Sequence, residues 1–535
     1  MSNRLVEVAE NFVSGGLLLF LGDFSSTIIL AIGSILVARL LGPSSYGLYS
    51  LIFVIPSLFL SLIGLGLENA VMVYPAKFKA ENRIERSVEI FKSALIFRSI
   101  VGLTFSIIGF LLADFLSTNM LNRPELGFYV KLASIIILFQ GLFTLIYSGF
   151  IGLDKAHTSS FIKILMSIIK VSFSLLLIII GLGIIGAILG HVLGYTTAGI
   201  IGILLFFISY RNLKNNSYNT VDKNDYSFTN DIKLMINYGI PLYFSSLLGL
   251  IAGQYQLILL AFYTSNTEIG NFNAAVNLSS IISILVTPIG NALFPAFSKL
   301  SSEDENARKF FNLSVKYISL LIIPTTIAVI IFSPDLVRLL YGKEYMLASI
   351  YLPIYIILYL YTGLGSYSII ALFNGLGKTQ LTLKVQLMNL TILIPLALFL
   401  TMMRGVLGLI LTLLISNLLS LIYGFTLARK KFNITISFRD QLMIYLSSLL
   451  SALPSILFLH FISFGSSFFN SLLNLAIGAI IYLIVYLTLL PALKAIDEHD
   501  IENLKQIFRK IKILWPIIRL LIDYETKLLR VTKSH

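Results

Sequence analysis

The sequence predicts an all-α membrane protein with about fourteen transmembrane helices, arranged as two pseudo-symmetric six-helix lobes plus two extra helices. Three observations support this fold class. The 535 residues are 57% hydrophobic and only 12% charged, which is typical of an integral membrane protein. Apolar runs of about twenty residues recur along the chain, and each is long enough to cross a bilayer. Four short motifs also recur at a nearly constant offset.

The expected helices follow the apolar runs in chain order. The first run, Phe12 to Leu41, exceeds the core of a signal peptide, so we expect it to be a permanent span. Gaps rich in charged or turn-forming residues separate the runs, with expected limits of 14–41, 47–67, 93–117, 127–149, 161–181, 184–209, 235–262, 270–296, 313–333, 346–373, 383–402, 405–428, 440–462 and 468–490.

Four motifs in the first half return about 220 residues later, which predicts a duplicated half with the substrate site at the interface of the repeats. One pair is the turn Ala38–Tyr49, which returns in Tyr263–Phe272. The others are Tyr74-Pro75-Ala76 with Phe294-Pro295-Ala296, Gly152-Leu153-Asp154-Lys155 with Gly375-Leu376-Gly377-Lys378, and Gly183-Ile184-Ile185-Gly186 with Gly405-Val406-Leu407-Gly408.

The repeat and the composition of the gaps give the expected domains. The N-lobe takes residues 1–210, a polar cytoplasmic linker takes 211–233, and the C-lobe takes 234–428. Two further spans occupy 429–496. The tail 497–535 is expected to be an amphipathic basic helix on the inner leaflet, with an apolar stripe of Ile501, Leu504, Phe508, Ile511 and Leu514.

The formal net charge of +13 is a topology signal. With the N-terminus inside, most of the 39 Lys and Arg residues fall in segments that face the cytoplasm. This pattern predicts an even number of spans, both termini in the cytoplasm and a place in the cell membrane. It also argues against nucleic acid as a partner.

Enzyme chemistry is not expected. No His, Cys or carboxylate residues have metal-ligand spacing, and the five histidines are scattered. Gly377-Lys378-Thr379 resembles a phosphate-binding loop, but Leu372 stands where that motif needs glycine. The expected outer loops are short. We therefore predict no catalytic residues, no metal and no cofactor.

Ionisable residues inside the expected spans are candidates for function, because charge is costly within a bilayer. Asp23 is either a proton- or cation-coupling carboxylate or the partner of a nearby cation. Arg98 and Lys170, and less strongly Arg39, are candidates for binding a diphosphate. The alternative for these three is that each long side chain extends to the membrane surface.

The second half offers amides instead of charges. Gln254, Gln256, Asn277 and Asn417 are candidates for contacts with sugar hydroxyls, and the alternative is hydrogen bonding between helices. A cationic half and a neutral polar half suit a ligand with an anionic head and a polar, uncharged body.

With these motifs in place, the chain resembles the polysaccharide-transporter branch of the multidrug/oligosaccharidyl-lipid/polysaccharide exporter superfamily. The resemblance rests on Ala38–Tyr49, on Gly270–Leu300 and on the motifs at Gly375–Lys378 and Gly405–Gly408. It implies two six-span lobes around a central cavity with alternating access. It also implies export of a lipid-linked oligosaccharide, whose diphosphate would meet cavity cations. The second lobe lacks the membrane carboxylate that a sodium site of some relatives needs.

Four functions are compared. The leading hypothesis is a flippase that moves a polyprenyl-(di)phosphate-linked oligosaccharide to the outer leaflet, working as a monomer among membrane lipids. The alternative is a cation-coupled multidrug exporter of the same superfamily, for which Asp23 would be the coupling group. A membrane glycosyltransferase or ligase conflicts with the short outer loops, and a structural scaffold does not explain the duplicated halves.

Overall fold

The computed structural model describes residues 3–81, 83–215, 227–300, 305–461, 468–509 and 515–533. These residues form α-helices joined by short 3₁₀ and π turns, and no strand occurs among them. The expected all-α class is confirmed. The chain divides into two compact units, Met1–Asn273 and Ala274–His535. The predicted division into an N-lobe and a C-lobe at the linker 211–233 stays a prediction. Residues 216–226 of that linker lie outside the described residues.

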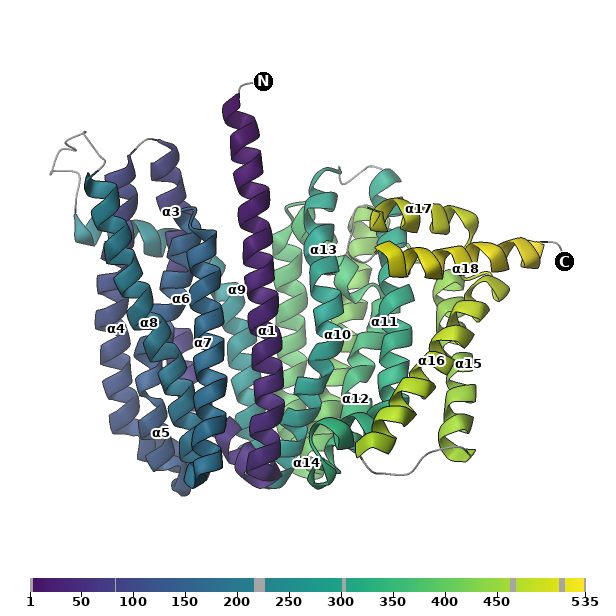
Figure 1. Ribbon diagram of the computed structural model, residues 1–535, viewed down its shortest axis with the longest axis horizontal. Coiled ribbons are helices and arrows are strands. Elements are labelled where there is room, and N and C mark those ends of the chain that lie inside the picture. Colours follow the sequence, from purple (N-terminus) through teal and green to yellow (C-terminus); the bar gives the residue numbers. More distant parts are fainter. Residues whose placement is uncertain are drawn as a thin grey trace. The chain divides into compact units, whose positions relative to one another are not determined.

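The first unit is a bundle of helices that run along one another, seen for α4, α6, α7 and α8 in Figure 1. Its helices are α1 (Asn3–Ile52), α2 (Val54–Ile63), α3 (Leu67–Ala80), α4 (Ile84–Asn119), α5 (Gly127–Ala133), α6 (Ile135–Gly152), α7 (Ala156–Leu177), α8 (Gly183–Asn215), α9 (Phe228–Tyr263) and the first turns of α10 (Asn266–Ser298).

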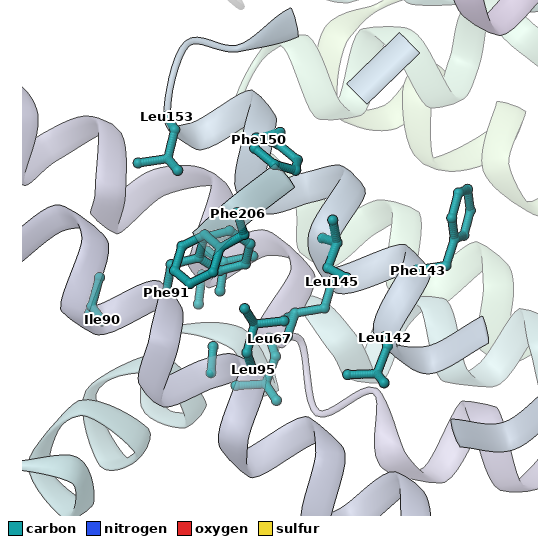
Figure 2. Packing of buried hydrophobic residues seen from close by; sticks show 14 of the residues in the cluster. Leu67, Ile90, Phe91, Leu95, Leu142, Phe143, Leu145, Phe150, Leu153 and Phe206 are labelled. Carbon is teal, nitrogen blue, oxygen red and sulfur yellow. The ribbon is translucent and has the colours of Figure 1, made fainter. Parts of the chain in front are cut away.

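Aromatic packing fills the centre of this bundle. Phe91 of α4 and Phe206 of α8 meet edge to face with ring centroids 4.7 Å apart, and Phe150 of α6 lies against Phe91 (Figure 2). All three side chains are buried. The contact ties α4, α6 and α8 together.

The second unit holds the rest of α10 and eight further helices. They are α11 (Glu305–Leu340), α12 (Ala348–Leu360), α13 (Ser366–Gly375), α14 (Thr379–Phe432), α15 (Phe438–Phe461), α16 (Phe468–Ala492), α17 (Glu498–Phe508) and α18 (Trp515–Lys533).

Within the described residues, nine helical runs are long and apolar enough to cross a membrane, or ten with a pair bent by 53°. Three of these runs, Leu18–Ile63, Ala156–Ile208 and Thr379–Phe432, contain 46, 53 and 54 residues. Each is long enough for two crossings at 1.5 Å per residue. Counted in this way, and with the shorter apolar helix Leu247–Tyr263 added, the described runs accommodate the fourteen expected spans.

The backbone carries the predicted repeat. Gly183 and Gly405 occupy matched motif positions, and both break a helix with the same unusual conformation, φ 51°, ψ −127° and φ 56°, ψ −133°. Only glycine adopts such angles without strain. Asp154 and Gly377 are also matched and both have positive φ. The same hydrogen bond closes each turn, from Lys155 N to Phe150 O and from Lys378 N to Phe373 O, at 2.8 Å in both cases.

The C-terminal tail forms two helices rather than one. In Figure 1, α18 runs crosswise to α15 of the same unit. The first tail helix is held to α11 by a buried ion pair between Lys316 and Asp500. Tyr317 donates a second hydrogen bond to Asp500 at 3.2 Å. Residues Ile511 and Leu514 of the expected apolar stripe lie outside the described residues.

The second tail helix packs on α16 through a mixed apolar face. Ile522 and Leu529 of α18 join a buried cluster that includes Tyr482 and Tyr486 of α16. Glu525 lies on the same face and is only 5% exposed. Neither of its carboxylate oxygens has a hydrogen-bond partner among the described residues. Burial therefore raises the pKa of the Glu525 carboxyl to about 8.

We expect the docking of α18 to depend on pH. Docking of α18 raises the pKa of the Glu525 carboxyl, so protonated Glu525 stabilises the docked helix. This stabilisation is complete below the ordinary pKa of 4.5 and is lost as pH rises through about 8. Trp515, the one tryptophan in the chain, begins α18, so its fluorescence should report undocking over this range. Glu525→Gln should abolish the pH dependence. An unchanged fluorescence titration in that variant would contradict this assignment.

Candidate functional site

Asp23 of α1 forms an ion pair between helices. Lys163 of α7 donates to its carboxylate at 2.7 Å, and the hydroxyl of Tyr147 of α6 donates at 2.8 Å. Asp23 therefore has the cation partner that was one of the two predicted alternatives. Its negative charge is matched within the first unit.

Arg98 of α4 is buried, with only 1% of its surface exposed. Its guanidinium donates to the carboxylate of Glu68 of α3 and to the backbone carbonyl of Ile63 at the end of α2. The residue thus ties three helices together. Its charge is balanced by an acid that the sequence places at the end of an expected span.

Lys170 of α7 has neutral neighbours. Its ammonium lies 3.4 Å from Nε2 of His191 and 5.6 Å from the ring centroid of Tyr195, both on α8. No carboxylate among the described residues forms an ion pair with it, unlike Arg98 and Lys163. Lys170 is only partly exposed. A cation held among apolar helices without a counter-charge is the feature expected of an anion site.

His191 is the functional candidate that the sequence analysis missed. Its Nδ1 lies 3.4 Å from the hydroxyl of Tyr49 of α1, and its ring stacks on Phe53 with centroids 4.3 Å apart. On the other side the ring lies 5.2 Å from that of Tyr195. The imidazole therefore bridges Lys170 of α7 and Tyr49 of α1, and aromatic rings pack around it.

The sequence does hold a signal for His191. The glycines Gly181 and Gly183 interrupt the helix between α7 and α8, with φ of 100° and 51°. An antiparallel hairpin closed there brings Lys170 opposite the stretch near residue 194, within one turn of His191. Gly194 permits this approach, because an added Cβ would lie 2.6 Å from Cβ of Lys170.

The polar groups of α7 follow one face of the helix. Lys163, Ser167 and Lys170 are spaced by four and three residues, which places them on adjacent turns. The hydroxyl of Ser167 bonds to that of Ser26 on α1, one turn beyond Asp23. The result is a polar stripe with two lysines, of which one is neutralised by a carboxylate and the other is not.

The remaining predicted residues are more dispersed. Arg39 is exposed near the break of α1 at Gly42, and Gln254 and Gln256 are partly buried on α9 of the first unit. Oε1 of Gln254 has no hydrogen-bond partner among the described residues. In the second unit, Asn277 is partly buried on α10. Asn417 is exposed on α14 and donates to the carbonyl of Leu413 at 2.8 Å.

We also looked for residues that could bind a metal ion. The described ranges contain no cluster of three or more His, Asp or Glu side chains that could hold an ion.

Comparison with protein families decides what kind of chain this is. A profile of the family described as "Polysaccharide biosynthesis protein" matches residues 12–301, more than half of the 535 residues. The chain belongs to this family. A putative O-antigen transporter of Shigella dysenteriae is 34% identical over 98 residues, which is 18% of this chain. The chain spans only 24% of that relative's length.

Solved structures show the same fold at low sequence identity. The lipid II flippase MurJ, in an inward closed conformation, matches with a TM-score of 0.69 and 18% identity, over 89% of this chain and 99% of MurJ. An inward-facing multidrug resistance transporter of the MATE family in the MOP superfamily matches with a TM-score of 0.60 and 18% identity, over 76% and 94% of the two chains. The chain therefore shares its fold with MurJ and with this MATE transporter.

We expect Arg98 to act on stability. Replacing it with methionine removes the cation that faces Glu68 and leaves this carboxylate with the hydroxyl of Thr144 at 3.4 Å. Breaking a fully buried pair costs about 3–5 kcal/mol, and because the Glu68 side chain is 30% exposed we expect a loss at or below the lower end of that range. The purified Arg98→Met protein should therefore denature at a lower temperature than the wild type. Adding Glu68→Gln should recover much of the loss. A single variant with wild-type thermal stability would contradict this role.

Proposed function

We propose that the protein is a flippase that moves a polyprenyl-(di)phosphate-linked oligosaccharide from the cytoplasmic to the outer leaflet by alternating access. The protein would work without a chemical step, so no catalytic residue or cofactor is needed. The family and the fold support a transporter of this general class. The choice of substrate rests on the charges of the first unit.

The observation that carries the proposal is the ammonium of Lys170, whose partners among the described residues are the neutral groups of His191 and Tyr195. An anionic head group would supply the missing counter-charge. We assign this contact to the diphosphate that links the lipid to the sugar. Arg98 was the other main diphosphate candidate, but its charge is already matched by Glu68.

The sugar would meet uncharged polar groups. Gln254 and Gln256 of the first unit and Asn277 and Asn417 of the second remain the proposed contacts. Gln254 is the strongest of these, because a buried amide oxygen without a partner can accept from a sugar hydroxyl. Arg39 stays a candidate for a second phosphate contact, near the outer end of the expected span 14–41.

The main alternative, a cation-coupled multidrug exporter, shares the fold, so the fold does not separate the two. The charges favour the flippase. A pump for cationic drugs needs a free carboxylate, whereas Asp23 is paired with Lys163 at 2.7 Å. The positive ammonium of Lys170 would repel such a drug.

The direction and the place of transport follow from the predicted topology. The positive-inside pattern puts both termini in the cytoplasm of a cell-membrane protein. Substrate synthesised on the inner leaflet would enter from that side. One chain with two repeated halves suffices for alternating access, so we propose a monomer.

Replacing Lys170 with methionine tests the proposed contact, because methionine keeps much of the side chain and removes the charge. We expect at least a roughly tenfold loss of surface glycan export, corresponding to about 1.4 kcal/mol of lost interaction. Export is measured as surface polysaccharide in cells that carry the variant in place of the wild type, at equal protein levels.

Lys131→Met is the matched control, since Lys131 pairs with exposed Asp114 and such surface pairs contribute little. This variant should export normally. Normal export by Lys170→Met would remove the diphosphate role from Lys170.

A further inference from the structure

We propose that His191 takes up a proton when the anionic head group binds at Lys170, so that head group and proton occupy one site together. The inference rests on the proposed function, because it assumes that an anion binds at Lys170. His191 was not among the residues predicted from the sequence. The proposal makes the proton a co-substrate of the head group.

The hydrogen bonds define the state of His191 before an anion binds. An ammonium can only donate, so Nε2 of His191 must accept from Lys170 at 3.4 Å. The ring's one proton then lies on Nδ1, which donates to the hydroxyl oxygen of Tyr49 at 3.4 Å. His191 is therefore neutral, with its proton directed toward α1 and its lone pair toward α7.

The surroundings oppose a second proton in this state. Within the part of the chain that the structure describes, the titratable groups that face the ring are Lys170 from α7, Tyr49 from α1 and Tyr195 from α8 itself. The other close contact is the ring of Phe53. From α6, the ring of Phe143 packs against that of Tyr195 with centroids 5.4 Å apart. A proton on Nε2 would place two positive charges 3.4 Å apart, and none of the facing groups is a carboxylate.

An anion reverses this balance. When the ammonium of Lys170 donates to the head group, it releases the lone pair of Nε2. A proton from water can then bind there, and the imidazolium donates to the anion through Nε2 and to Tyr49 through Nδ1. A diphosphate diester carries two negative charges, and ammonium plus imidazolium carry two positive charges. The bound complex is neutral, which lowers the cost of burying the head group among apolar helices.

The coupling has a measurable sign. If one proton binds with the anion, affinity rises as pH falls, by up to about tenfold per pH unit where His191 is neutral in the free protein. The proton leaves when the head group leaves. A merely structural His191 would show neither effect.

The experiment uses the full chain in lipid nanodiscs and UDP-glucose as the probe. This nucleotide sugar has the diphosphate diester of a lipid-linked sugar and no group that titrates between about pH 5 and 8, where histidine does. Isothermal titration calorimetry in two buffers of different ionisation heat gives both affinity and proton uptake. The wild type should bind more tightly at lower pH and take up a proton.

His191→Gln keeps a hydrogen-bond acceptor for Lys170 but cannot be protonated, so it should bind with no proton uptake and no pH dependence. His157→Gln is the matched control, since His157 is exposed at the start of α7, and it should behave as the wild type does. Wild-type binding that is independent of pH and buffer would overturn the coupling and leave the anion site in place. An unchanged pH slope in His191→Gln would do the same.

Lys170→Met separates the two proposals. Loss of UDP-glucose binding in this variant supports the anion site on which the coupling rests. If the wild type itself does not bind the probe at any pH, both the anion site and the coupling are wrong.

Discussion

The matching of charge inside an apolar bundle is the constraint on which this structure depends. An unpaired charge among membrane helices is costly, so each such group needs a partner or a function. In the first unit Arg98 is matched by Glu68, and Lys163 is matched by Asp23. Lys170 is only partly exposed, and no carboxylate among the described residues pairs with it. The proposed substrate class, the argument against cationic drugs and the proposed role of His191 all rest on that difference.

Backbone conformation at glycines sets the positions of these charges. The break at Gly181 and Gly183 turns α7 into α8, and Gly194 lets the two helices approach at the level of Lys170. The same break recurs at Gly405 in the second half, where Ile392 stands at the position that corresponds to Lys170. The two halves thus share the helix break, whereas the lysine is present in the first half alone.

The sequence predicted the helical membrane class and the repeat, because apolar runs and glycine motifs are local patterns that need no tertiary information. It also identified Asp23, Arg98 and Lys170 as costly charges. It did not predict the pairing of Glu68 with Arg98, since that contact joins residues 30 positions apart across a broken helix. His191 was set aside as one of several scattered histidines. His191 lies next to Lys170 only because α7 and α8 pair as a hairpin. The glycines that close this hairpin are visible in the sequence and indicate which residues lie opposite one another.

Translocation of a lipid-linked oligosaccharide is the central claim, and lipid extracts from cells that lack the gene test it most directly. Mass analysis of carrier-linked sugars should be combined with analysis of surface glycans. The account predicts that a carrier-linked oligosaccharide accumulates on the inner leaflet while a surface glycan is lost. The mass of the accumulated oligosaccharide would identify the substrate. Normal glycans together with new sensitivity to cationic dyes would contradict the account and favour a drug exporter.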